Sequence, residues 1–264
     1  MKKIFHYLKY YLAVAKLSYM SSAMYRADHL LRYFRIILEF SISVLTINTL
    51  FVHSKSLAGW SKAEVFMIYS IWLFIVCLYH FFTSGSNYQT NREIRKGNLD
   101  LLLTKPIDSQ FSASFRQVHI DNIFRVLGCV IIFLYAFSQL KLHPNLLEIL
   151  LFILQMIGGV AIYYSFAFWA VILTFATQGS EQIAIFDSIN GLGKYPADIY
   201  PKKVIAVFFS VIPLAYFSLI PALTLLGRSN VWLILMSLVA PFIFLILTRV
   251  FWLLSLRTYS SASS

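Results

Sequence analysis

Residues 91–111, NREIRKGNLDLLLTKPIDSQF, form a polar stretch that separates two long apolar segments. In the whole chain of 264 residues, 59% are hydrophobic, 17% are aromatic and only 12% are charged. A soluble domain typically has about 25% charged residues. The composition therefore predicts an all-α, polytopic membrane protein, in which the polar stretch is a connection outside the bilayer.

The apolar segments have the length of membrane spans. A transmembrane helix needs about 20 mainly apolar residues. Windows of this kind occur at 34–52, 63–83, 120–140, 147–175, 203–225 and 231–253. We therefore expect about six transmembrane helices. Ser61 and Glu64 have capping-box spacing and mark the start of the second one.

The basic residues predict the orientation. With a cytoplasmic N-terminus, most of the 22 Lys and Arg fall in cytoplasmic segments, and the outer connections hold only Lys55, Lys62, Lys141 and Arg228. The positive-inside rule then places both termini in the cytoplasm, in a bacterial inner membrane. The basic start lacks the pattern of a signal peptide, so we expect it to be retained. In so hydrophobic a chain, the net charge of +11 indicates a membrane surface as partner and not nucleic acid.

The chain is predicted to form one transmembrane domain, 1–264. Residues 1–30 form an amphipathic interfacial helix, 34–83 the first two spans, 84–118 a cytoplasmic segment, 119–253 the remaining spans and 254–264 a cytoplasmic tail. The first helix has two faces. Lysines share one face and apolar residues the other: Lys2, Lys9 and Lys16, against Ile4, Leu8, Tyr11, Leu12 and Ala15.

The region 147–225 allows two divisions. In the first, 147–175 is one long fourth helix and 177–202 is a cytoplasmic link. In the second, a fifth span lies at about 166–190, KYPADIYPKK is extracellular, and 203–225, broken by Pro213 and Pro221, is a re-entrant hairpin. Discontinuous backbone at membrane depth is tolerated where protein covers it. Both divisions leave the C-terminus on the same side.

The polar stretch itself predicts a short helix. Gly97 would end the incoming helix, Asn98 would cap a new one, and Pro106 would stop it. Leu99, Leu102 and Leu103 then form an apolar face available to a partner. The alternative is an ordinary interfacial loop whose leucines dip into lipid.

Two sequence motifs resemble a known family. EIRKGNLDLLLTKPI resembles the coupling segment of type-2 ABC exporter (ABC-2) permeases, with the pattern E-x-x-x-G-x-L-(D/E)-x-L-L-x-x-P. The stretches FAFWAVIL, KYPADIYPKK and IPLAYFSLIPALTLLG resemble a subfamily of six-span permeases of about this chain's length. The resemblance implies a coupling helix that docks into an ATPase subunit through Glu93, Gly97, Leu99, Asp100, Leu102, Leu103 and Pro106.

Charged and aromatic residues inside the spans are candidates for a translocation path. Glu39 lies deepest and would suit a cationic substrate, whereas Arg35–Glu39 and Asp121–Arg125 have the i, i+4 spacing of simple ion pairs. Aromatic faces can bind flat cations, although packing and interfacial anchoring are the favoured explanation for these residues. The candidate path residues are Glu39, Tyr69, Trp72, Phe168 and Trp169.

Motifs of enzymes are absent from the sequence. GLGK at 191–194 lacks P-loop spacing and is followed by Tyr195, and there is no H-E-x-x-H, paired Cys-x-x-Cys or G-x-S-x-G. Cys77 and Cys129 lie in apolar runs and are interpreted as core residues. We expect no catalytic, metal or cofactor site here, with ATP and Mg²⁺ on a separate subunit.

The favoured hypothesis is the permease subunit of an ATP-driven ABC exporter, working with ATP-binding-cassette ATPase subunits and a second, identical or paralogous, permease. A drug-like cation, as in multidrug efflux, a lipid or a glycan would each fit as substrate. Two alternatives remain: a membrane anchor that recruits a cytoplasmic partner, and a stand-alone ion-coupled carrier. A carrier predicts internal repeats with paired broken helices, and only the C-terminal half here has proline interruptions.

Overall fold

The computed structural model describes residues 2–23, 26–119, 122–179, 181–210 and 214–259. Their regular secondary structure is entirely helical. The helices are, in order, α1 (Lys2–Ala23), α2 (Arg26–Leu50), α3 (Lys62–Tyr79), η1 (His80–Ser84), α4 (Gly85–Arg95), α5 (Asp100–Leu103), α6 (Ser109–Ser114), α7 (Asn122–Leu140), α8 (Leu146–Thr177), α9 (Glu181–Asn190), η2 (Gly191–Lys194), η3 (Ala197–Ile199), α10 (Lys202–Ser210), α11 (Leu214–Phe217), α12 (Leu219–Leu225) and α13 (Val231–Leu256).

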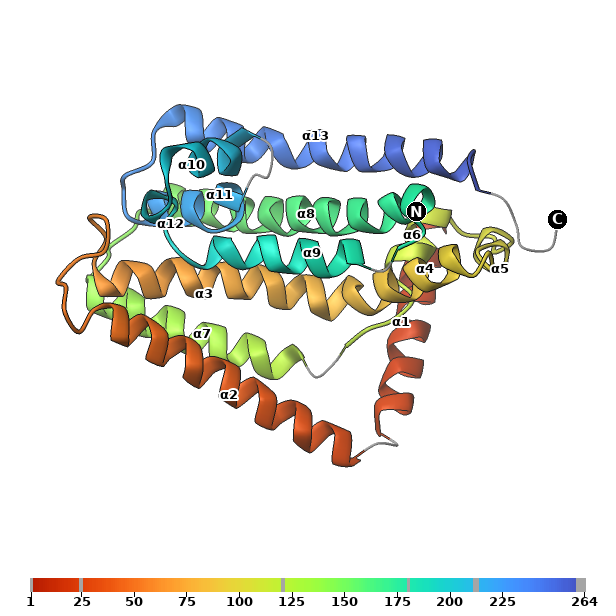
Figure 1. Cartoon of the computed structure of the whole chain (residues 1–264), viewed down its shortest axis with the longest axis horizontal. Coiled ribbons are helices and arrows are strands. Elements are labelled where there is room, and N and C mark those ends of the chain that lie inside the picture. Colours follow the sequence, from red (N-terminus) through yellow and green to blue (C-terminus); the bar gives the residue numbers. More distant parts are fainter. Residues whose placement is uncertain (1, 24–25, 120–121, 180, 211–213, 260–264) are drawn as a thin grey trace.

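The long helices α2, α3, α7, α8 and α13 run along the long axis of the molecule (Figure 1). Helix α3 packs on α7, and α8 packs on α13. We call the end that carries α1, α4, α5 and α6 the terminal end, because α1 begins there and α13 ends there. The opposite end, where 51–61, 141–145 and 226–230 connect helices, is the loop end (Figure 1).

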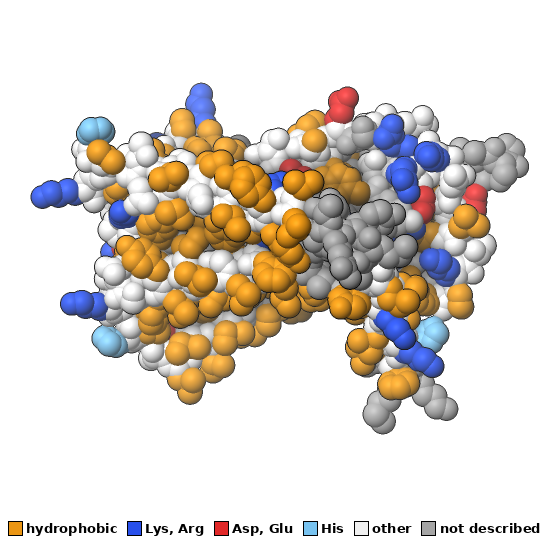
Figure 2. All heavy atoms as spheres, turned by 90° about the horizontal axis from the view of Figure 1, so that it is seen from below, with side chains coloured by type: hydrophobic (Ala, Val, Ile, Leu, Met, Phe, Trp, Pro, Cys, Tyr) orange, Lys and Arg blue, Asp and Glu red, His pale blue; other side chains and the backbone are white. Residues whose placement is uncertain are grey.

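Four helical segments in the described residues are long and apolar enough to cross a membrane: Lys62–Arg95, Asn122–Leu140, Leu146–Thr177 and Val231–Leu256. Figure 2 shows hydrophobic side chains over the middle of the molecule and Lys and Arg toward its two ends. This distribution is that of a protein whose belt faces lipid. The predicted all-α, polytopic membrane fold is therefore confirmed.

Helix α3 begins at the predicted capping box. The Ser61 amide donates to Glu64 Oε2 over 2.7 Å, and the Glu64 amide donates to Ser61 Oγ over 3.4 Å. Its continuation Lys62–Arg95 has 34 residues, or about 51 Å at 1.5 Å per residue. The hydrocarbon core is only about 30 Å thick, so α4 extends beyond it at the terminal end. The π-helix η1 interrupts this run.

The region 147–225 combines the two predicted divisions. Helix α8 is one long helix of 32 residues, as in the first division. Helix α9 then returns beside it toward the loop end (Figure 1). There Trp60 Nε1 donates to Asp198 Oδ2 over 2.8 Å, which places KYPADIYPKK at the loop end, as in the second division. The fifth pass thus begins with α9 at Glu181 and reaches the loop end at Asp198, and the predicted boundary near 166 is wrong.

Residues 202–225 are a re-entrant segment and not the full span that the window 203–225 first indicated. The segment follows Asp198 at the loop end and returns there, because Arg228 forms an ion pair of 2.8 Å with Glu64 at the start of α3. Between these points it reaches inward, where Ser218 Oγ donates to the Gly193 carbonyl over 3.0 Å. Pro213 lies outside the described residues. With α9 as the fifth pass, the described chain passes six times between the two ends.

The observed topology changes the predicted positions of three lysines. The predicted orientation counts Lys194, Lys202 and Lys203 among the cytoplasmic residues, but Lys202 and Lys203 follow Asp198 at the loop end. Lys194 lies inside the bundle, with its ammonium 5.1 Å from the centre of the Trp72 ring. The terminal end still carries the larger share of the Lys and Arg.

Helix α1 stands across the long helices at the terminal end (Figure 1). Its inner side packs on the segment around α6, where the Tyr7 and Phe111 rings lie 4.8 Å apart. Of the predicted apolar face, Tyr11 packs beside Phe115, whereas Leu8 and Leu12 are exposed. Burial raises the pKa of Tyr11 to about 12. The helix therefore has one face on the protein and a separate exposed apolar face.

Glycines let the long helices approach closely. A Cβ on Gly158 would meet Pro241 of α13, and a Cβ on Gly159 would meet Ile75 of α3 and Phe217 of α11. The two glycines thus let α8 pack closely between its neighbours.

Cys77 and Cys129 are buried with their sulfurs 3.7 Å apart, as core residues.

Candidate functional site

The segment 93–118 leaves the bundle at the terminal end, and Gly97 ends α4 as predicted. Gly97 has φ +67°, its amide donates to the Ile94 carbonyl over 3.1 Å, and the Asn98 amide donates to the Glu93 carbonyl over 3.0 Å. This is a Schellman motif, which glycine favours because it requires a left-handed residue. The chain turns sharply there.

The short helix α5 begins differently from the prediction. Its N-cap is Leu99 and not Asn98, and that cap has no side-chain hydrogen bond. The Leu99 amide instead donates to the Tyr259 hydroxyl over 3.0 Å. The helix ends at Leu103, shortly before Pro106, as predicted.

The predicted leucine face is partly wrong. Leu99 and Leu102 are buried at 0% and 1% exposure, in a cluster with Phe168 and Trp252. Leu101 is 77% exposed, and Leu103 is 38% exposed. Two of the three predicted leucines therefore hold α5 onto α8 and α13, and the leucines that face outward are Leu101 and Leu103.

Glu93 fastens α4 to the chain that follows α6. Its carboxylate forms an ion pair of 2.7 Å with Arg116, whose side chain is only 8% exposed. Gln89 Nε2 donates to Glu93 Oε1 over 3.0 Å, and Arg116 also donates to Thr90 Oγ1 over 2.8 Å. The sequence did not indicate Arg116, because its partner lies 23 positions away.

Asp108 joins this segment to the last long helix. It accepts from the Phe111 amide as the N-cap of α6, and it forms an ion pair of 2.6 Å with Arg249 of α13. Burial raises the pKa of Asp108, but hydrogen bonds from Arg249 and from the Phe111 and Gln110 amides outweigh it and hold that pKa below 3.8. The sequence could have indicated the N-cap from an Asp just after Pro106, but not the contact with α13.

Further hydrogen bonds tie the segment to α8 and α13. Gln110 Nε2 donates to the Tyr164 hydroxyl of α8 over 3.2 Å, and Trp252 Nε1 donates to Ser109 Oγ over 3.0 Å. On its other side, the Asp108 amide donates to the Tyr7 hydroxyl of α1 over 3.3 Å. Residues 93–118 therefore form a plate fixed to three helices, which we call the coupling plate.

The candidate path residues do not form one site. Tyr69 and Trp72 stack with ring centres 6.1 Å apart, and both are buried. Phe168 is buried beside Trp252, and Trp169 Nε1 donates to Thr248 Oγ1 over 2.8 Å. These aromatics make packing contacts in two separate regions.

Glu39 has a partner on another helix. Its carboxylate forms a two-pronged ion pair with Arg125 of α7, at 2.6 and 3.4 Å. The predicted pair Arg35–Glu39 is thus replaced by a contact between helices, and Asp121 lies outside the described residues. The carboxylate remains 42% exposed, but its charge is compensated.

Trp72 lies beside the junction at which α9 continues as the 3₁₀-helix η2. Its Nε1 donates to the Asn190 carbonyl over 3.1 Å, and Asn190 Nδ2 donates to the Tyr163 hydroxyl. The Oδ1 atom of Asn190 is buried without a hydrogen-bond partner. Irregular helices with polar groups at membrane depth are common in transport proteins, and sequence reasoning did not indicate Asn190.

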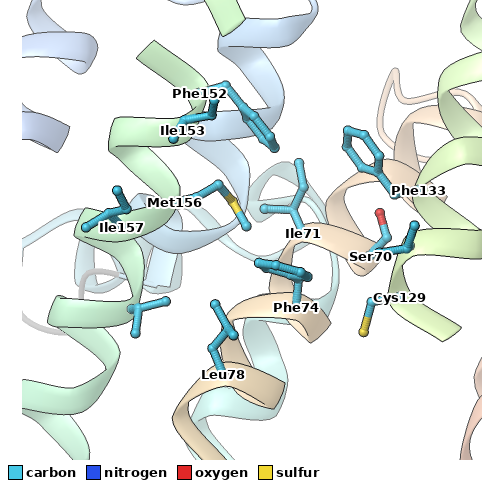
Figure 3. A pocket seen from close by; sticks show the side chains of 12 residues that line it. Ser70, Ile71, Phe74, Leu78, Cys129, Phe133, Phe152, Ile153, Met156 and Ile157 are labelled. Carbon is cyan, nitrogen blue, oxygen red and sulfur yellow. The ribbon is translucent and has the colours of Figure 1, made fainter. Parts of the chain in front are cut away.

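An apolar pocket of about 490 Å³ opens between α3, α7 and α8. Figure 3 shows Ile71 and Phe74 from α3, Phe133 from α7 and Met156 from α8 pointing into it. Its lining contains almost only hydrocarbon, so it suits an apolar group such as a lipid chain. None of the predicted path residues lines it.

Comparison with known proteins identifies the family. The family model described as "ABC-2 family transporter protein" matches residues 37–263. Since this range covers most of the chain, the protein belongs to the ABC-2 transporter family and is a membrane transport component. No curated protein and no solved structure matches it significantly.

Proposed function

We propose that the chain is the permease subunit of an ATP-driven exporter, with the terminal end in the cytoplasm of a bacterial cell. In this proposal two such subunits, identical or paralogous, form the translocation path. Separate ATP-binding-cassette subunits carry ATP and Mg²⁺ and dock on the coupling plate. Family membership supports the role in transport.

The observation that carries the coupling role is the construction of the plate. It presents Leu101, Leu103 and Lys105 outward, while Leu99 and Leu102 are buried against the bundle. An exposed apolar side chain flanked by basic ones suits a cleft with acidic margins. Movement of a docked subunit would therefore pull on α8 and α13 through buried contacts.

Transport would involve the change from α9 to the 3₁₀-helix η2 near Trp72. The 3₁₀-helix at 191–194, the re-entrant tip at Ser218 and the unpartnered Asn190 Oδ1 lie together inside the bundle. Packed helices move between discrete arrangements more readily than they deform. We propose that the plate transmits motion to this region along α8.

The test is an affinity purification of the tagged protein from mild detergent, with identification of co-purifying proteins by mass spectrometry. A P-loop ATPase should co-purify with the wild type and be lost in Leu101→Glu. The matched control is Leu146→Glu, because Leu146 is 73% exposed, much like Leu101, but lies at the loop end.

The outcomes separate the alternatives. Recovery of the protein without any ATPase, under conditions that preserve other membrane complexes, would favour an ion-coupled carrier. An ATPase bound equally by both variants would remove the docking role from Leu101. Recruitment of a partner that is not an ATPase, with no transport in vesicles, would favour the membrane anchor.

A further inference from the structure

A basic cavity lies at the terminal end between α2, η1 and α7. It has a volume of about 200 Å³, whereas one water needs only about 10–15 Å³. Three arginines and two histidines dominate its lining, which consists of Arg32, Arg35, Ile36, His80, Ser84, His119, Asn122 and Arg125. No carboxylate belongs to this lining in the described part of the chain. The cavity therefore has room and charge for an anion larger than water.

The π-helix η1 shapes one wall of this cavity. The His119 amide donates to the Phe81 carbonyl inside η1 over 3.1 Å. Gly85 follows at once, and a side chain there would collide with the His119 imidazole. The close approach brings His119 next to the helix that carries His80, so both imidazoles face the same space. π-helical turns inside α-helices are frequent at functional sites.

The charge of the cavity is only partly compensated. Arg125 is held by Glu39 in the two-pronged ion pair. Arg35 sits one helical turn before Glu39 and is exposed, and its guanidinium adds a further positive charge. A planar guanidinium matches the oxygens of a phosphate group in pairs. The site therefore selects an anion, and a phosphate in particular.

An apolar groove continues from this cavity along α2 and α7. Its volume is about 670 Å³, and Ile36 belongs to both. Ile37, Leu127 and Ile131 line it and are well exposed, and the missing side chain of Gly128 makes room for the Phe40 ring. Because α2 and α7 both run from the terminal end toward the loop end, the groove leads toward the middle of the membrane.

The depth of the cavity fits a headgroup. Helix α3 starts at Lys62, so His80 lies about 27 Å further along the helix axis, at 1.5 Å per residue. The hydrocarbon core is about 30 Å thick. The cavity is thus at the boundary between hydrocarbon and headgroups, and basic pockets between helices on this side commonly hold anionic headgroups.

We propose that this amphipathic site binds one anionic phospholipid of the leaflet at the terminal end. Its phosphate lies in the basic cavity, and an acyl chain lies in the groove between α2 and α7. The lipid fills the space between these two helices beside the Glu39–Arg125 contact. It is a site for a bound lipid, separate from the apolar pocket of Figure 3.

The experiment is native mass spectrometry of the purified protein in detergent, titrated with phosphatidylglycerol, phosphatidylcholine or inorganic phosphate. The wild type should retain one phosphatidylglycerol per chain, in preference to phosphatidylcholine. Each arginine near a charged membrane surface contributes about 1 kcal/mol, so Arg35→Gln should weaken binding about fivefold and Arg32→Gln/Arg35→Gln about 25-fold. Arg257→Gln removes the same charge at the same end and should change nothing.

The groove is tested separately by Ile131→Trp, which fills it without changing any charge. Retention of phosphatidylglycerol should fall in this variant while its folding, checked by size-exclusion chromatography, stays normal. Equal retention of the two lipids, or losses as large in Arg257→Gln as in Arg35→Gln, would overturn the proposal. So would tight binding of inorganic phosphate alone, or a dimer that excludes lipid because a second copy covers the groove.

Discussion

Two adjacent leucines in the coupling plate should contribute very differently to the stability of the protein. Leu102 is 1% exposed within a cluster that includes Phe168 and Trp252, whereas Leu101 is 77% exposed. Truncation of a buried leucine to alanine costs about 2–5 kcal/mol, from lost burial and the cavity left behind. Exposed positions usually change stability by less than about 0.5 kcal/mol. Leu102→Ala should therefore destabilise the protein by about 3 kcal/mol, and Leu101→Ala should not.

The assay is thermal unfolding of both variants in detergent, and the readout is the fraction of protein that remains monodisperse at each temperature. At about 2–4 °C per kcal/mol for a chain of this size, Leu102→Ala should lower Tm by about 6–12 °C. Leu101→Ala should keep the wild-type Tm and instead weaken association with the ATPase. The reasoning about which leucines face outward would be refuted if both variants lost stability equally.

Four further substitutions test other contacts. Tyr11→Phe should be neutral or slightly stabilising in thermal unfolding, because the Tyr11 hydroxyl is buried without a partner, whereas Tyr7→Phe should destabilise by about 1 kcal/mol through loss of its hydrogen bond to Asp108. Gly159→Val should reduce the yield of folded protein, since its side chain would collide with α3 and α11, and normal yield would contradict that packing. Because the pKa of Asp108 is lowered in the folded protein, the stability from its ion pair with Arg249 is complete above about pH 4 and lost below it. Asp108→Asn should lower Tm at pH 7 and flatten its pH dependence, and an unchanged profile would count against the pair.

Local signals in the sequence predicted local structure well. The apolar windows other than 203–225 fall on long helices, the capping box at Ser61 starts α3, and Gly97 ends α4 in a left-handed conformation. Each of these depends on residues within one or two turns, so no distant part of the chain has to be known. The same holds for the short helix before Pro106.

Contacts between distant segments could not be predicted in this way. Glu39 has the right spacing for Arg35, yet it pairs with Arg125, because α2 and α7 place those groups together. Likewise, helical periodicity alone places Leu99, Leu102 and Leu103 on one face. Leu99 and Leu102 are buried because the end of α13 packs against them. Which of these leucines are buried therefore depends on contacts of the whole terminal end.

The construction of the coupling plate also limits how it can move. Asp108 pairs with Arg249 of α13, Gln110 Nε2 donates to the Tyr164 hydroxyl of α8, and the Asp108 amide donates to the Tyr7 hydroxyl of α1. A hinge inside the plate would have to leave the buried Glu93–Arg116 pair without partners, which is costly for charged groups. A hinge in α8 or α13 breaks no such contact. Force applied at Leu101 should therefore displace the plate as one body, together with the terminal ends of α8 and α13. The change of shape should occur deeper in the bundle, where α9 changes to a 3₁₀-helix beside Trp72.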